Sequence, residues 1–209
     1  HDDADGRLPS PFHVIPRYID PGDTWSRSLA HCNSRIAIHL HLFYFDLLED
    51  FVARFRSIPF DFDLFVSVPD FAPKAQIVSI EHSFRDALQG RARKIVLKPV
   101  PNRGRDIAPF IVEFGKTLIE YDIVGHFHTK KSPHNPQLKG WHDTVVDLLL
   151  GPTGNPGGHV AYIVGMLESD AKMVCAEGSV LIPREPTGWA GNYSIARNIL
   201  NRLGLSIRD

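Results

Sequence analysis

The segment KIVLKPVPNRGRDIAPF, residues 94–110, changes from one pattern to another within a few residues. Its first seven residues form a short, mostly apolar run of the kind that predicts a buried β-strand. A polar turn, residues 102–106, follows and contains Gly104, a residue that suits tight turns. Because a strand that passes through a turn into a helix is the building unit of α/β domains, this segment predicts an α/β fold.

A helix is expected directly after this turn. Apolar residues recur there at helical spacing, namely Ile107, Phe110, Ile111, Phe114, Leu118 and Tyr121. Pro109 is compatible with this helix, because the first turn leaves backbone N–H groups without an intrahelical partner. Asp106 stands where the helix N-cap is expected. We predict that this is the strongest helix of the chain.

Strand and helix patterns alternate over the rest of the chain. Further strands are predicted at residues 36–42, 62–68, 123–128 and 173–176. Helices are predicted at about residues 46–58, 141–149, 160–167 and 192–203, while residues 81–89 stay unassigned. Asp46 and Glu49 have the spacing of a capping box for the first of these helices.

This alternation predicts a Rossmann-like α/β domain over residues 35–209. Its central sheet is expected to be mostly parallel, with helices on both faces. Residues 1–34 contain several prolines and no sustained periodicity, and they predict an irregular lead-in.

The composition limits the kinds of partner. A chain of 209 residues with 43% hydrophobic residues supports one domain with its own core. A net charge of −1 argues against a surface that coats nucleic acid or an anionic membrane, since both require an excess of Lys and Arg. Cys32 and Cys175 lie far apart and lack metal-ligand spacing, which favours a reducing compartment. We therefore expect a cytoplasmic domain in which any phosphate binding is local.

Neither a membrane segment nor a signal peptide is predicted. No apolar run approaches the roughly 20 residues that span a bilayer. The first residues, HDDAD, lack the basic-then-apolar order of a signal peptide, and the chain begins without Met. We expect a piece of a longer protein, whose other parts can hold it at the inner face of the membrane.

Residues 102–106 form a first candidate site. Arg103 and Arg105 bring two guanidinium groups next to the free N–H groups of a helix start, and such a turn can hold an anion. Asp106 is itself anionic, so it is better suited to a ribose or sugar hydroxyl than to phosphate. Alternatively, Asp106 only caps the helix and the arginines are solvated.

Residues 126–131, HFHTKK, form a second candidate site. Strand alternation places His126 and His128 on one face of the sheet. Lys130 and Lys131 follow where the strand should end, and from there they can neutralise a diphosphate leaving group.

A second H-x-H pair, His39 and His41, lies in the predicted strand 36–42. If the two histidine-bearing strands are adjacent, four imidazoles converge. Such pairs can ligate a metal, although a histidine pair beside a sheet is more often a hydrogen-bonded core element. Glu177, just past the last predicted strand, is either a catalytic base or a solvated loop acid.

Three blocks, residues 35–44, 101–110 and 126–134, in this order and at this spacing, resemble the rhamnan synthesis protein F family over about residues 34–207. The resemblance implies a bacterial glycosyltransferase of cell-wall and lipopolysaccharide synthesis. Its donor would be a nucleotide diphosphate sugar, with dTDP-rhamnose the leading candidate, and its acceptor a glycan. The resemblance also implies a glycosyltransferase A-type fold that is incomplete at the C-terminus.

In that fold an Asn-x-Gly turn opens a helix, and a later strand ends in a metal-binding Asp-x-Asp motif. Asn102, Arg103 and Gly104 match the turn, whereas residues 126–131 put histidines and lysines in place of the acidic motif. Lysine can balance the departing diphosphate without a cation. This departure from the pattern favours a metal-independent site that needs no cofactor besides the donor, with a divalent metal as the less favoured alternative.

The fold analogy also orders the sheet. It places strand 36–42 beside strand 123–128, with the winding of the chain reversing between them, and ligands of open α/β sheets bind at such a switch point. His41 and Tyr44 would then lie near His128, with Ser67 on the nucleotide side.

We predict the following roles. The catalytic residues are Asp106, His128, Lys130 and Glu177. The donor-binding residues are His41, Tyr44, Ser67, Asn102, Arg103, Gly104, Arg105, His126 and Lys131. Two other functions fit the sequence: a catalytically silent binding or scaffold domain of a larger synthase, which would bind no nucleotide, and a metal-dependent hydrolase, which would bind zinc.

Overall fold

The computed structural model describes residues 12–15, 32–129, 141–152, 158–169, 171–176, 193–202 and 204. The chain divides into two units, His1–Glu177 and Gly178–Asp209, and each is described by itself. In the second unit, α7 (Tyr193–Arg202) is the helix predicted near residues 192–203. All the other elements belong to the first unit.

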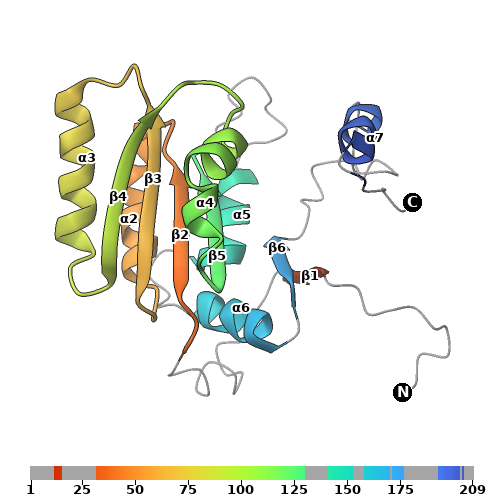
Figure 1. Cartoon of the computed structure of the whole chain (residues 1–209). Coiled ribbons are helices and arrows are strands. Elements are labelled where there is room, and N and C mark those ends of the chain that lie inside the picture. Colours follow the sequence, from red (N-terminus) through yellow and green to blue (C-terminus); the bar gives the residue numbers. More distant parts are fainter. Residues whose placement is uncertain are drawn as a thin grey trace. The chain divides into compact units, whose positions relative to one another are not determined.

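A four-stranded parallel sheet forms the centre of the first unit (Figure 1). Its strands are β2 (Ile36–His41), β3 (Phe62–Pro69), β4 (Ala92–Val100) and β5 (Ile123–His128), in the order β4-β3-β2-β5. The chain winds outward from β2 to β4 and then returns to the other side of β2 as β5. The predicted adjacency of strands 36–42 and 123–128 is therefore confirmed, and the topological switch point lies between β2 and β5.

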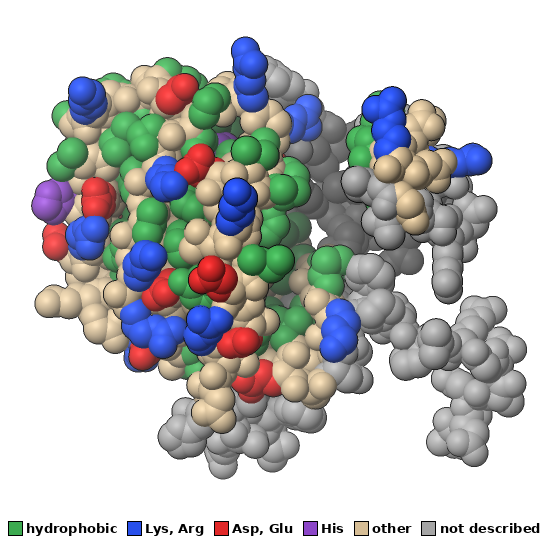
Figure 2. Space-filling model, in the orientation of Figure 1, with side chains coloured by type: hydrophobic (Ala, Val, Ile, Leu, Met, Phe, Trp, Pro, Cys, Tyr) green, Lys and Arg blue, Asp and Glu red, His purple; other side chains and the backbone are tan. Residues whose placement is uncertain are grey.

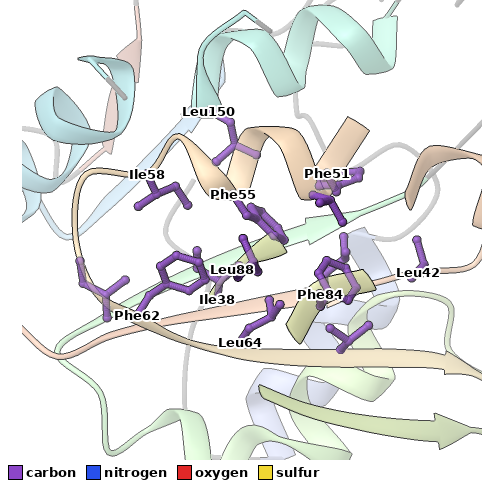
Figure 3. Close-up of a cluster of buried hydrophobic side chains, with 14 of the residues drawn as sticks. Ile38, Leu42, Phe51, Phe55, Ile58, Phe62, Leu64, Phe84, Leu88 and Leu150 are labelled. Atoms are coloured by element: carbon purple, nitrogen blue, oxygen red, sulfur yellow. The ribbon is translucent and has the colours of Figure 1, made fainter. Parts of the chain in front are cut away.

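Helices cover both faces of this sheet, as predicted for a Rossmann-like fold. One face packs against α2 (Leu48–Arg56), α3 (Lys74–Ala87), α5 (Trp141–Leu150) and α6 (Gly158–Ser169). Figure 3 shows this core, with Phe51 and Phe55 of α2 turned toward Ile38 and Leu64 of the strands. Even-numbered residues of β2 and β3 supply the core, which leaves their odd-numbered residues for the opposite face.

The predicted capping box at Asp46 and Glu49 is wrong. The chain enters α2 through a short 3-10 turn, η1 (Phe45–Leu47), and Leu47, whose side chain cannot cap, occupies the N-cap of α2. Asp46 thus falls inside the turn. The segment left unassigned at residues 81–89 belongs mostly to α3, which buries Ile80 and Phe84.

The single strong helix predicted after the 102–106 turn is also wrong. The structure has instead a π-helical turn, η2 (Pro109–Glu113), followed by a short helix, α4 (Gly115–Leu118). The wider turn takes Ile111 out of the apolar stripe, and its side chain is 60% exposed. Phe114 and Leu118 alone of the predicted stripe are fully buried, against Ala37 and Phe65 of the sheet. Ala108, not Asp106, holds the N-cap position of η2. The Asp106 carboxylate instead lies near the His126 ring on β5.

Two further strands pair apart from the central sheet. β1 (Phe12–Ile15) runs parallel to β6 (Met173–Ala176), with Phe12 opposite Met173. β6 was predicted as a strand, whereas β1 lies in the region predicted to be an irregular lead-in.

The surface of the face drawn in Figure 2 mixes basic, acidic and hydrophobic side chains over the sheet and its helices. This mixture agrees with the net charge of −1. None of the helices in the described ranges has the length and apolar character that a membrane crossing requires.

Candidate functional site

Four histidines lie on one face of the sheet at the switch point. β2 contributes His39 and His41, and β5 contributes His126 and His128. The register places His39 opposite His126 and His41 opposite His128. All four side chains point to the face covered by η2 and α4, where the rings of Phe110 and Phe114 lie within 5.6 Å and 5.3 Å of the His39 ring centroid.

A hydrogen-bonded chain connects three of these rings to Ser67 of β3. His41 Nδ1 lies 2.8 Å from Ser67 Oγ, and the same oxygen lies 3.1 Å from His39 Nε2. His39 Nδ1 lies 3.0 Å from His126 Nδ1. His126 Nε2 in turn lies 3.4 Å from Asp106 Oδ2. The chain therefore crosses three neighbouring strands and ends at a carboxylate on the turn after β4.

The backbone of that turn explains how Asp106 reaches the sheet. Gly104 and Arg105 both adopt the left-handed conformation, with φ of 69° and 54°. A Cβ atom at Gly104 would overlap the Ala108 Cβ. Glycine is therefore required at residue 104 by both its conformation and its close approach to the next turn.

The ionisation of the site follows from its burial. Burial, reinforced by the neighbouring His126 and His41, lowers the pKa of His39 to about 3. Burial also lowers the pKa of His41 and of His126. For Asp106, burial acts to raise the pKa, but a hydrogen bond from its own backbone N–H and the nearby His128 and His126 outweigh burial and lower the pKa below its usual value. Near pH 7 the network thus consists of neutral imidazoles and one carboxylate.

A cavity of about 360 Å³ opens beyond the carboxyl ends of β2 and β5. It is lined by His41, Phe43, Tyr44, Asn102, Arg105, Asp106, His128 and Thr129. The cavity thus combines a carboxylate, a guanidinium group, two imidazoles and two aromatic rings. Its position at the switch point is where ligands of open α/β sheets bind.

Thr129 organises the wall of this cavity. Its Oγ1 accepts hydrogen bonds from the backbone N–H groups of Phe43 and Tyr44, at 2.8 Å and 2.9 Å. The same hydroxyl donates to the carbonyl of His41 at 3.3 Å. The segment after β2 is therefore tied to the end of β5. Thr129 lies within the second candidate site, residues 126–131, but the prediction from sequence gave it no role of its own.

Apart from Ser67, the predicted site residues fall into four groups. Those that line the cavity are His41, Tyr44, Asn102, Arg105, Asp106 and His128. His126 holds Asp106 instead of lining the cavity. Arg103 and Gly104 are exposed in the turn, outside the set of lining residues. Lys130, Lys131 and Glu177 lie outside the described residues.

Ser67 takes a different place from the one predicted. It was expected on the nucleotide side, but it is 0% exposed and its hydroxyl bonds to two histidines. A side chain so enclosed cannot contact a ligand in the cavity. Ser67 instead supports His41 from within the sheet.

Among the described residues, no group of three or more His, Cys, Asp or Glu side chains is placed to hold a metal ion. For His39 the geometry gives a reason, because both of its ring nitrogens already have hydrogen-bond partners, in His126 and Ser67.

Comparisons with known proteins point to polysaccharide synthesis. The family described as rhamnan synthesis protein F matches residues 6–206. Two curated relatives are both named "Uncharacterized protein WxcX" and come from two different strains of Xanthomonas campestris pv. campestris. Each is 25% identical to this chain over 122 residues. That region is 58% of this chain and 16% of each relative, so the chain spans only a small part of their length. No solved structure gives a significant match.

Proposed function

This chain belongs to the rhamnan synthesis protein F family, and on that premise we propose that its cavity binds the nucleotide diphosphate sugar donor of a glycosyl transfer in bacterial cell-surface polysaccharide synthesis. The leading donor is dTDP-rhamnose. The observation that carries the proposal is the cavity at the β2–β5 switch point, where Asp106 and Arg105 from one turn face His41 and His128 from two strands.

The lining supplies a group for each part of such a donor. Arg105 and Asn102 can donate hydrogen bonds to phosphate oxygens. The Asp106 carboxylate can accept hydrogen bonds from sugar or ribose hydroxyls, which phosphate cannot donate. Phe43 and Tyr44 offer ring faces for a base or a sugar. A volume of about 360 Å³ lies within the usual range of small-molecule sites.

The diphosphate leaving group requires positive charge. Lys130 and Lys131 follow directly after Thr129, a residue of the cavity wall, so their place in the chain supports this role. We propose that they stabilise the leaving diphosphate in place of a metal ion.

Calorimetric titration with dTDP and with UDP, with and without Mn²⁺, tests the donor site. Arg105→Gln should weaken dTDP binding about tenfold, since it removes a charge-assisted hydrogen bond worth roughly 1.5–3 kcal/mol. Arg103→Gln is the matched control, because Arg103 lies in the same turn outside the cavity lining, and it should change the affinity less than twofold.

Three results would count against the proposal. Failure of every nucleotide diphosphate to bind the wild type would leave the silent binding or scaffold domain as the better reading. Equal losses for Arg103→Gln and Arg105→Gln would place the donor elsewhere. Binding that depends on Mn²⁺ would refute only the proposal that lysines replace the metal ion, and the donor site itself would stand.

A further inference from the structure

The hydrogen-bonded chain from Asp106 to His41 has a direction that its chemistry determines. Asp106 is ionised, and a carboxylate only accepts hydrogen bonds. His126 Nε2 must therefore carry the proton in its contact with Asp106 Oδ2. A neutral imidazole has a single N–H, so His126 Nδ1 is an acceptor, and His39 Nδ1 must donate to it across 3.0 Å.

The same reasoning continues to the cavity. Because His39 Nδ1 carries the proton of its ring, His39 Nε2 accepts, and the Ser67 hydroxyl donates to it. Ser67 has one hydroxyl proton, which this bond uses. Its oxygen therefore accepts from His41 Nδ1 at 2.8 Å. The His41 ring is then protonated at Nδ1 and carries a free electron pair at Nε2.

His41 is the member of this chain, besides Asp106, that lines the cavity. It is only 7% exposed, so its ring is held between the sheet and the cavity. Since Nδ1 is turned to Ser67, Nε2 is the ring nitrogen available to a bound molecule.

We propose that His41 Nε2 is the proton acceptor for the attacking hydroxyl of the glycan, and that Asp106 fixes His41 in the required tautomer through His126, His39 and Ser67. This inference rests on the proposed donor site. In the step, the acceptor oxygen forms a bond to the anomeric carbon while its proton passes to His41 Nε2. The bond from the anomeric carbon to the diphosphate oxygen breaks, and its electron pair leaves with the diphosphate.

The charge that forms on His41 is influenced by groups from each neighbouring element. Those that share its cavity or its network are His39 on β2, Tyr44 after β2, Arg105 and Asp106 on the turn, and His126 and His128 on β5. Asp106 stabilises an imidazolium at His41, whereas burial, His128 and His126 oppose it. The acidic limb of the transfer rate against pH should therefore report the protonation of His41.

The tautomers can be measured without any activity assay. In ¹⁵N-labelled protein at pH 7, two-bond ¹⁵N–¹H correlation spectra assigned by single-histidine variants should show Nε2–H at His126 and Nδ1–H at both His39 and His41. Ser67→Ala should release His41 from the Nδ1–H form while His126 keeps its Nε2–H. An Nε2–H proton at His41 in the wild type would overturn the proposal.

A transfer assay separates positioning from structural support. With dTDP-rhamnose and a rhamnan acceptor, His41→Gln should lower the release of dTDP at least 100-fold, while the dTDP affinity stays within threefold. Ser67→Ala should lower the rate of dTDP release at least tenfold and shift the acidic limb of the profile of this rate against pH. Tyr121→Phe is the matched control, because it removes the 2.6 Å bond to Asp63 on the same face of the sheet, away from the cavity, and it should leave both the rate and the profile unchanged.

The outcomes distinguish this inference from the donor site itself. A wild type that binds no nucleotide refutes the donor site, whatever the tautomers are. A wild type that binds dTDP but transfers no sugar, or a His41→Gln variant that transfers at the wild-type rate, refutes the role of His41 and leaves the donor site intact.

Discussion

His39 and His126 face each other across adjacent strands, with their Nδ1 atoms 3.0 Å apart and their rings within 4° of parallel. Two protonated rings cannot share this contact, because both nitrogens would then be donors. Because His39 donates from its Nδ1, this contact keeps a second proton off His126, while burial keeps off His39 the second proton that a free imidazole would take up below pH 6.5.

This exclusion predicts a loss of stability in mild acid. Burial lowers the pKa of His39 from 6.5 to about 3, so between these values the unfolded chain binds a proton that the folded chain does not. The contribution of His39 to the free energy of unfolding is therefore fully present above pH 6.5. It falls by roughly 4 kcal/mol as the pH is lowered toward 3. Denaturant unfolding at a series of pH values measures the free energy of unfolding as a function of pH. This free energy should fall less steeply with decreasing pH for His39→Gln than for the wild type. His82→Gln, at an exposed position of α3, should keep the wild-type slope, and identical slopes for all three proteins would contradict the prediction.

Gly104 and Gly90 offer a matched pair of substitutions. Both have positive φ, at 69° and 78°, so alanine at either residue should cost about 1 kcal/mol for the left-handed backbone. A Cβ at Gly104 also meets Ala108, whereas nothing lies within 4 Å of a Cβ at Gly90. We expect Gly104→Ala to lower the free energy of unfolding by about 1 kcal/mol more than Gly90→Ala, and to weaken dTDP binding because the turn that carries Asp106 must shift. Equal effects of the two changes on both measurements would argue against this packing.

Arg54 ties α2 to the end of α5. Its guanidinium donates to Asp50, Asp147 and the carbonyl of Gly151 at 2.9, 2.6 and 2.7 Å, and the residue is only 6% exposed. Arg54→Met should lower the free energy of unfolding by about 3 kcal/mol, since it leaves two carboxylates and a buried carbonyl without this donor. Arg85→Met removes an exposed pair with Glu81 and should cost less than about 0.5 kcal/mol. Chemical denaturation measures both values, and a loss below 1 kcal/mol for Arg54→Met would contradict the assignment.

Thr129 can be tested by an isosteric change. Thr129→Val keeps the shape of the side chain but leaves the N–H groups of Phe43 and Tyr44 without their acceptor, and it should cost about 2 kcal/mol of stability. Because these residues line the cavity, dTDP binding should weaken as well. Thr129→Ser retains the hydroxyl and should preserve binding in the same titration. A valine variant with wild-type affinity would show that this bond does not shape the site.

Sequence patterns predicted the strands better than the helices. Short apolar runs located β2, β3, β4 and β5, because a buried strand has apolar residues wherever both faces are covered. The stripe from Ile107 to Tyr121 failed, since helical spacing describes a regular helix and cannot reveal a π-helical turn whose extra residue breaks the spacing. The unassigned residues before β4 became part of α3, where packing against the sheet stabilises a helix whose own pattern is weak.

Local patterns also placed some residues of the candidate site correctly and failed for others. His126 and His128 could be assigned to one face because alternation is a local property of an extended strand. Ser67 was expected on the ligand side, but it is 0% exposed because His39 and His41, on the same face of the sheet, cover it and bond to its hydroxyl. No local pattern reveals that side chains of a neighbouring strand cover a residue in this way.

The sequence by itself determined which residues form the strands of the central sheet, that each of two strands carries a histidine pair on one face, and that a glycine turn brings Asp106 to the start of the following segment. Only the tertiary structure decided that Ser67, His39, His126 and Asp106 bond in series and that His41 ends the chain at the cavity. The physical reason is that each of these bonds joins residues on different strands or turns. Their distances depend on the register between strands and on the backbone conformation of the turn, which packing of the whole domain sets.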